Sequence, residues 1–92
     1  MPYIKDEDRK EPDMVRVTRA IARAVESGTI KDKGDMNYVF FFMARRFMEK
    51  FGYRYGVISD VKAAARDSAD EVERRFMTPR EDVAIKENGD VS

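Results

Sequence analysis

Four acidic side chains gather within seven residues of the chain: Asp67, Asp70, Glu71 and Glu73. Carboxylate oxygens are preferred ligands of Mg²⁺, and helical bundles can hold such ions between carboxylates on facing helices. Here, however, Asp67 and Asp70 fall opposite the apolar stripe of the helix that they are predicted to share. Arg66, Arg74 and Arg75 are also close enough for ordinary ion pairs on a helix surface. We therefore interpret the cluster as a solvated helix face and predict no metal and no cofactor.

A second cluster mixes cations with aromatic rings, as in proteins whose rings stack on bases while their cations hold phosphates. Its candidate nucleic-acid contacts are Arg45, Arg46, Lys50, Arg54, Tyr53 and Tyr55. Phe47 and Phe51 alternate with these residues, but their spacing assigns them to an apolar helix stripe. The chain carries 18 basic and 18 acidic residues, whereas nucleic-acid-binding proteins usually have a basic excess. Nucleic-acid association is therefore an alternative that is less favoured but stays open, with Arg16, Arg19 and Arg23 as a further basic stripe.

Two residue types that catalytic sites commonly use are missing from the sequence. The chain has no cysteine and no histidine, which removes thiolate nucleophiles and ligands, the usual general base and the usual nitrogen ligand of metals. We therefore predict that the protein is not an enzyme. The first ten residues do not look like a secretory signal, and no apolar run approaches the roughly 20 residues that span a bilayer. We expect a cytoplasmic protein with no membrane contact.

The pattern of apolar residues predicts an all-α fold of three main helices and a short C-terminal helix. An extended N-terminal arm over residues 1–11, with Tyr3 and Ile4 expected to dock on the body, leads into a helix over 13–27 that Pro12 begins and Gly28 ends. A second helix over about 36–51 is capped by Asp35 and ended by Gly52. A third covers 57–76, and Thr78, Pro79 and Glu81 form a capping box for a short fourth helix. Residues 88–92 form a tail, and the whole chain, 1–92, is predicted to be a single domain.

The helix over 36–51 is apolar on more than one side. One stripe consists of Met36, Val39, Phe40, Met43 and Phe47. This stripe is expected to pack on Ala64, Ala65 and Ser68 of the third helix, where small residues allow a close approach. A second stripe, with Phe41, Ala44 and Met48, then lacks a cover within the chain. We predict that these three residues form an oligomer interface.

Three separated motifs carry a resemblance to a known group of proteins. The chain begins with MPYI, its second helix opens with GDMNYVF, and its end reads PREDVAIKENGDV. In this it resembles a small family of prokaryotic and phage proteins of unknown function along nearly the whole length. The resemblance implies no activity or ligand. The matching positions are Gly34, Asp35, Asn37, Tyr38, Pro79, Glu81, Asp82, Glu87, Asn88, Gly89 and Asp90.

Two hypotheses for function follow. The favoured one is a small non-enzymatic interaction protein that completes a helical bundle by forming a homodimer, since two-fold dimers are the commonest oligomers. A different protein as the partner is left open. The alternative is a nucleic-acid-associated accessory protein, and the salt dependence of binding separates the two because phosphate contacts weaken steeply as salt rises.

Overall fold

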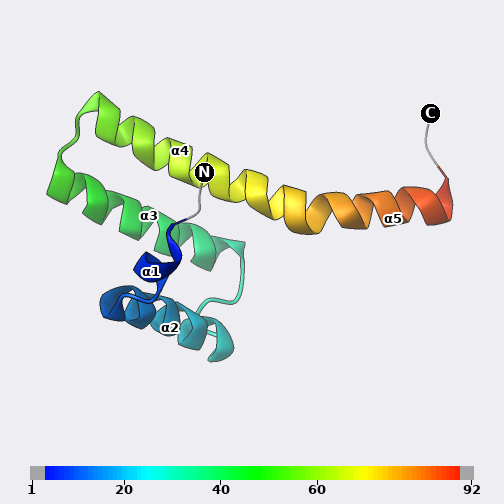
Figure 1. Ribbon diagram of the computed structural model, residues 1–92, viewed down its shortest axis with the longest axis horizontal. Helices are drawn as coiled ribbons and strands as arrows, with labels where there is room; N and C mark the ends of the chain where they lie inside the picture. The colour runs from blue at the N-terminus through cyan, green and yellow to red at the C-terminus, as the bar shows by residue number, and fades with distance from the viewer. Residues whose placement is uncertain (1–3, 90–92) are drawn as a thin grey trace. The chain divides into compact units, whose positions relative to one another are not determined.

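The computed structural model describes residues 4–89, and within them the chain is helical and contains no strand. The predicted all-α fold class is therefore confirmed. Figure 1 shows the order of the elements along the chain. They are α1 (Asp6–Arg9), α2 (Pro12–Glu26), α3 (Lys33–Phe51), α4 (Tyr55–Val72), a π-helical stretch η1 (Glu73–Met77) and α5 (Thr78–Asn88).

The described chain divides into two compact units, residues 4–57 and residues 58–89. The first unit contains α1, α2, α3 and the start of α4, and the second contains the rest of α4, η1 and α5. The prediction of a single domain stays a prediction. No helix within residues 4–89 is long and apolar enough to cross a membrane.

The N-terminal arm differs from the extended segment that the sequence predicted. Residues Asp6–Arg9 form one helical turn, and the side-chain Nε of Arg9 donates to the carbonyl of Ile4 at 3.1 Å. Ile4 is 43% exposed, so it is not docked in the way that the prediction required. Tyr3 lies outside the described residues. Three acidic residues within a short segment favour a helical turn here because they complement the positive end of a helix.

Helix α2 begins where the sequence predicts. Pro12 occupies its first turn, and the Glu11 carboxylate accepts hydrogen bonds from the backbone N–H groups of Asp13 and Met14, both at 3.1 Å. At its other end, Gly28 adopts a φ of 82° and donates to the carbonyl of Val25 at 3.2 Å. The predicted glycine cap is confirmed, since this left-handed conformation is one that residues with a Cβ rarely adopt.

Helix α3 begins three residues earlier than predicted, at Lys33 rather than Met36. Its N-cap is Asp32, whose carboxylate accepts from the backbone N–H of Asp35 at 2.9 Å. Asp32 and Asp35 both have side chains suited to this role, so composition alone did not distinguish them. The predicted end is confirmed, because Gly52 follows Phe51 with a φ of 100°.

The predicted capping box at Thr78 is wrong. Thr78 has helical dihedral angles of −58° and −46°, the N-cap position of α5 is Met77 without a side-chain capping hydrogen bond, and helical structure continues from α4 through η1 into α5. The backbone N–H of Thr78 bonds to the carbonyl of Glu73 in the wide π-helical pattern. A wide turn just before Pro79 accommodates a residue that has no N–H and whose ring would collide with the preceding turn of a regular α-helix.

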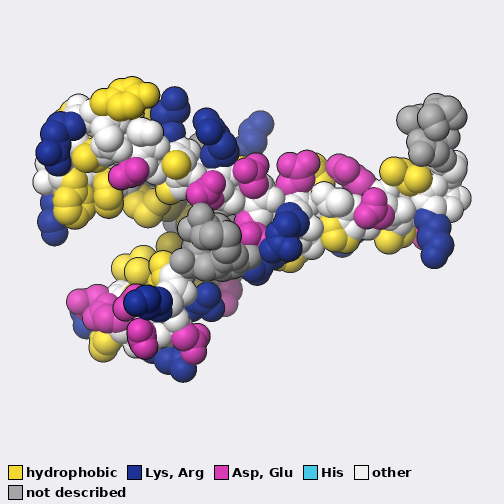
Figure 2. All heavy atoms as spheres, turned by 45° about the horizontal axis from the view of Figure 1, so that its top comes forward, with side chains coloured by type: hydrophobic (Ala, Val, Ile, Leu, Met, Phe, Trp, Pro, Cys, Tyr) yellow, Lys and Arg dark blue, Asp and Glu magenta, His cyan; other side chains and the backbone are white. Residues whose placement is uncertain are grey.

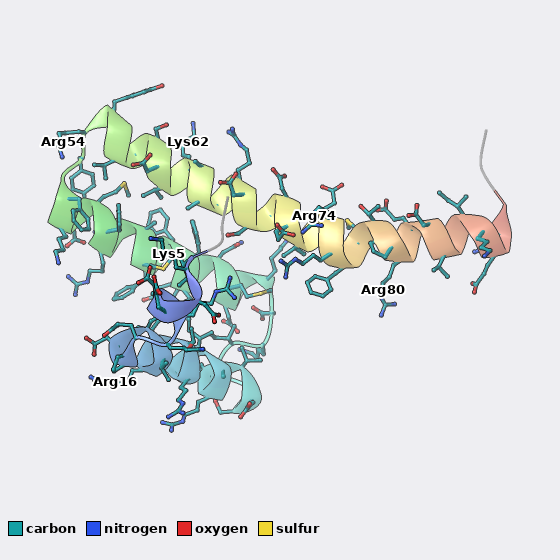
Figure 3. All side chains as sticks on the ribbon, viewed as in Figure 1. Lys5, Arg16, Arg54, Lys62, Arg74 and Arg80 are labelled. Atoms are coloured by element: carbon teal, nitrogen blue, oxygen red, sulfur yellow. The ribbon has the colours of Figure 1, made fainter. Side chains whose placement is uncertain are left out.

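Large apolar side chains remain exposed in the second unit. Phe76 is 65% exposed and Val83 is 54% exposed. Figure 2 shows apolar side chains beside basic and acidic ones along α5, and Figure 3 shows Arg80 projecting outward from the same helix.

The small residues of α4 were predicted to pack against the first apolar stripe of α3. Of these residues, Ala64 and Ser68 are exposed and Ala65 is half-buried.

Gly28 provides a direct test of how α2 is ended. A Cβ added at Gly28 would meet nothing within 4 Å, so the substitution Gly28→Ala has only its positive φ to oppose it. We expect a loss of about 1 kcal/mol in the free energy of unfolding. Gly56→Ala is the matched control, because its added Cβ also meets nothing within 4 Å but the residue lies inside α4. That control should leave stability unchanged or raise it. Urea unfolding of both variants measures the difference, and an equal effect of the two would contradict the assignment.

Candidate interaction surface on α3

Helix α3 exposes apolar side chains on two opposite faces. The first face meets α2 across an open groove of about 440 Å³. The groove is lined by Ile21, Val25, Ile30, Lys31, Asp32, Met36, Val39, Phe40 and Met43. Four of the five residues predicted for the first stripe therefore face α2, but the groove is not closed. Met36 is 57% exposed and Met43 is 58% exposed.

The second face carries a shallow hollow of about 400 Å³. We call it the α3 hollow, and it is lined by Tyr38, Phe41, Phe42, Arg45, Arg46 and Glu49. All six residues come from one helix at successive three- and four-residue steps, which bring side chains onto the same face. No loop needs to be ordered to form this surface. Its geometry follows from the backbone of α3 alone.

The aromatic side chains of the α3 hollow are largely uncovered. Tyr38 is 72% exposed, Phe41 is 61% exposed and Phe42 is 53% exposed. In contrast, Ala44 is 7% exposed and is the one buried hydrophobic residue among residues 4–89. The largest apolar patch on a protein surface, especially one rimmed by charged residues, is often a surface where another molecule binds.

Arg46 is held over the hollow by two neighbours on the same helix. Its guanidinium carbon lies 5.5 Å from the centre of the Phe42 ring, within the range of a cation–π contact. Its Nη1 atom lies 3.5 Å from an oxygen of Glu49. These contacts fix the side chain while its exposed fraction stays at 67%, so the charge remains available to a partner.

The three residues predicted for an oligomer interface have different surroundings. Phe41 lies in the α3 hollow and is exposed, as an interface residue of a single chain must be. Met48 is half-buried. Ala44 is already buried, so it has little surface left to bury against a second chain. Their role at an interface stays a prediction, and Phe41 is the one of the three that lines the α3 hollow.

The predicted nucleic-acid contacts are only partly brought together. Arg45 and Arg46 line the α3 hollow, but the other four do not. Lys50 lies over the Phe51 ring at 5.5 Å, and Arg54 donates from Nη2 to the Phe51 carbonyl at 3.3 Å. Figure 3 shows Arg54 at the turn between α3 and α4. The two tyrosines, Tyr53 and Tyr55, are 60% and 88% exposed.

The sequence contains the signal for the α3 hollow, but its residues are divided between two predicted sites. Phe41 belongs to the predicted oligomer interface, and Arg45 and Arg46 belong to the predicted nucleic-acid contacts. Tyr38 belongs to neither predicted site, although its side chain is 72% exposed. The three- and four-residue spacing from Tyr38 to Glu49 would have placed all six residues on one face.

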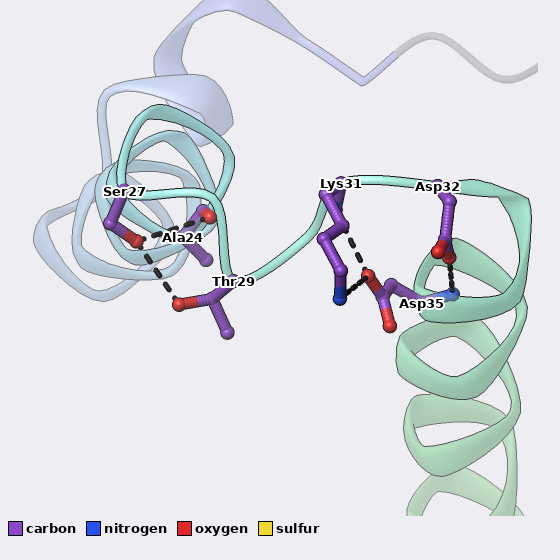
Figure 4. A network of polar contacts seen from close by, with 6 residues as sticks. All are labelled: Ala24, Ser27, Thr29, Lys31, Asp32 and Asp35. Atoms are coloured by element: carbon purple, nitrogen blue, oxygen red, sulfur yellow. Dashed lines mark hydrogen bonds and ion pairs between the residues drawn. The ribbon is translucent and has the colours of Figure 1, made fainter.

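The loop between α2 and α3 carries a short polar network (Figure 4). Ser27 bonds through its hydroxyl to the Ala24 carbonyl at 3.3 Å and to the Thr29 hydroxyl at 3.1 Å. The Asp35 carboxylate accepts from the backbone N–H and the ammonium of Lys31, at 3.0 and 3.3 Å. The backbone hydrogen bond from Lys31, followed by that of its ammonium, holds the pKa of Asp35 below its usual value. These contacts set the entry of the chain into α3.

The acidic cluster of α4 and η1 makes ion pairs on the helix surface. Glu71 accepts from Arg74 and, at 2.8 Å, from the Nε atom of Arg75. The predicted pairing of this cluster with neighbouring arginines is confirmed for Glu71. Within the described part of the chain, no group of three or more acidic residues is arranged to hold a metal ion.

Comparison with known proteins identifies the family of this chain. Residues 1–91 match the family DUF6899, described as a domain of unknown function, and the chain belongs to that family. Searches of curated proteins and of solved structures gave no match. The family description assigns no activity, as the resemblance of the three sequence motifs implied.

Proposed function

We propose that this member of the DUF6899 family is a small non-enzymatic interaction protein. Its first partner is a second copy of the same chain, with which it forms a homodimer. The observation that supports this proposal is the exposed aromatic surface of the α3 hollow. Its three rings leave roughly 350 Å² uncovered, since each aromatic side chain can bury about 150–250 Å². At about 25 cal/mol per Å², covering this area is worth roughly 9 kcal/mol before costs.

That gain is comparable with what association costs. Lost translational and rotational freedom costs roughly 4–15 kcal/mol for two proteins. The α3 hollow alone therefore offsets much or all of this cost, and the open α2–α3 groove offers further apolar area on the opposite face. A second copy is the simplest partner, because closed two-fold dimers are the commonest oligomers.

Other parts of the proposal rest on the sequence. A non-enzymatic role is supported by the lack of histidine and cysteine among the 92 residues. A cytoplasmic setting agrees with a small domain that contains no disulfide, because small secreted domains usually depend on them. The resemblance of the sequence motifs supports a prokaryotic or phage source.

Phe41→Ala tests self-association through the exposed surface. Removing the ring takes apolar area out of both copies of the contact, and we expect the substitution to weaken the dimer by at least 2 kcal/mol, about 30-fold in the dissociation constant. Sedimentation equilibrium measures this change. Tyr55→Ala is the matched control, because Tyr55 is 88% exposed and lies outside the α3 hollow. Equal dimerisation of the Phe41→Ala variant and the unchanged chain would contradict the proposal.

The alternative function, nucleic-acid association, is favoured by one observation. Tyr53 and Tyr55 are exposed beside a turn that also carries Arg54, so two rings are free to stack on bases. Arg45 and Arg46 would add phosphate contacts further along α3. The alternative predicts binding that depends on both the tyrosines and the salt concentration.

A labelled single-stranded oligonucleotide distinguishes the two functions. Self-association as the main role predicts no anisotropy change at 150 mM salt, about the physiological ionic strength. Nucleic-acid binding predicts an affinity that falls with salt, with a slope near −0.7 for each phosphate contact, and that drops further in a Tyr53→Ser, Tyr55→Ser variant. Tight, salt-sensitive binding that needs both tyrosines would overturn the favoured function.

A further inference from the structure

The two ends of the α3 hollow differ in residue type, which gives the surface a direction along the helix. Its N-terminal half is aromatic, with Tyr38, Phe41 and Phe42, and its C-terminal half is charged. Arg45 and Arg46 come first in that charged half, and Glu49 closes it. This inference rests on the proposed self-association and asks how two such surfaces would meet.

The two possible orientations of a helix pair differ sharply in their charge contacts. In a parallel pair each residue lies near its own copy, so that arginine meets arginine and the like charges repel. In an antiparallel two-fold pair, residue i meets j and j meets i. Centred between Phe42 and Arg45, that pairing sets the aromatic half of one copy against the charged half of the other. The resulting pairs are Tyr38 with Glu49, Phe41 with Arg46, and Phe42 with Arg45.

We propose that two copies of this chain pair their α3 helices in antiparallel orientation through the α3 hollow. Two of the three kinds of contact are cation–π contacts, and the third is a hydrogen bond from the Tyr38 hydroxyl to a carboxylate oxygen of Glu49 of the partner subunit. Arg46 is suited to this arrangement because a guanidinium has two faces. Its guanidinium carbon lies 5.5 Å from the centre of its own Phe42 ring, and with 67% of the side chain exposed it can also receive an aromatic ring of the partner.

The size of the surface agrees with a specific contact. The rings contribute roughly 350 Å². The two arginines and Glu49 border them, with 67% of the Arg46 and 43% of the Glu49 side chain exposed. Together they bring the patch toward the roughly 800 Å² per partner of a standard interface. The α2–α3 groove has no comparable direction, because its walls are apolar and its charged residues, Lys31 and Asp32, lie next to each other.

The absence of cysteine allows a clean crosslinking test. Tyr38→Cys and Glu49→Cys are prepared as two separate chains and oxidised alone and as an equal mixture. In the antiparallel pair the two copies of residue 38 lie eleven residues apart, or about 16 Å at 1.5 Å per residue. A disulfide needs Cα atoms within about 7 Å. We therefore expect a covalent dimer from the mixture, at least tenfold more than from either variant alone.

A second measurement leaves the α3 hollow unchanged. Lys33→Cys places a spin label on the first residue of α3, which is exposed and lies outside the hollow. The antiparallel pair puts the two labels roughly 30 Å apart, whereas a parallel pair brings them within about 20 Å, given helix axes 8–10 Å apart. The distance is read by double electron–electron resonance, so the proposal stays testable if either cysteine substitution in the hollow weakens the dimer.

The outcomes separate this inference from the proposed function. A mixed crosslink together with the long label distance supports antiparallel pairing. Self-crosslinking of Tyr38→Cys, or a short label distance, shows a parallel pair and overturns the inference while self-association stands. If the protein is a dimer but shows no crosslink and a label distance that fits neither orientation, the dimer uses another surface. That result also overturns the inference of antiparallel pairing. A chain that stays monomeric at all concentrations overturns the proposed function and the inference with it.

Discussion

The structure depends on covering the apolar surface of α3. This helix carries large side chains on opposite faces, and neither face is closed within residues 4–57. With Ala44 as the one buried hydrophobic residue of the described chain, little of the usual driving force for folding is realised inside a single copy. Under the proposed function, contacts with a second copy supply part of the interactions that stabilise the native state. The proposed function links binding and stability, because the uncovered apolar surface is also the surface proposed to bind.

Local interactions determine where the helices of the first unit begin and end. Glu11 and Asp32 each accept hydrogen bonds from free N–H groups at a helix start, and Gly28 and Gly52 end helices with positive φ. Such signals position α2 and α3 without a large core, because they act within a few residues. They also hold the aromatic and charged residues of the α3 hollow in register, since all six lie on one continuous helix. A binding surface can therefore be ordered in a chain that leaves much of its apolar area exposed.

The sequence predicted the helical fold and the glycine-ended helices well, because periodicity and left-handed caps are local properties. It did not predict that helical structure continues through Pro79. The π-helical hydrogen bond from Thr78 to Glu73 compensates for the proline, and capping-box spacing contains no sign of it. The start of α3 was also displaced, since Asp32 and Asp35 are equally suited to cap a helix and only the hydrogen bond at 2.9 Å distinguishes them. The residues of the α3 hollow fall into two predicted sites because aromatic and cationic side chains suggest different partners. The structure shows that they share one face of the helix.

The central claim is that the native state is completed between chains, and thermal unfolding of the unchanged protein over a hundredfold range of concentration tests it most directly. Self-association that stabilises the folded chain predicts an unfolding midpoint that rises steadily with protein concentration, because mass action favours the bound state. A midpoint that is independent of concentration, with a single cooperative transition throughout, would show that one copy is stable alone and would contradict the account.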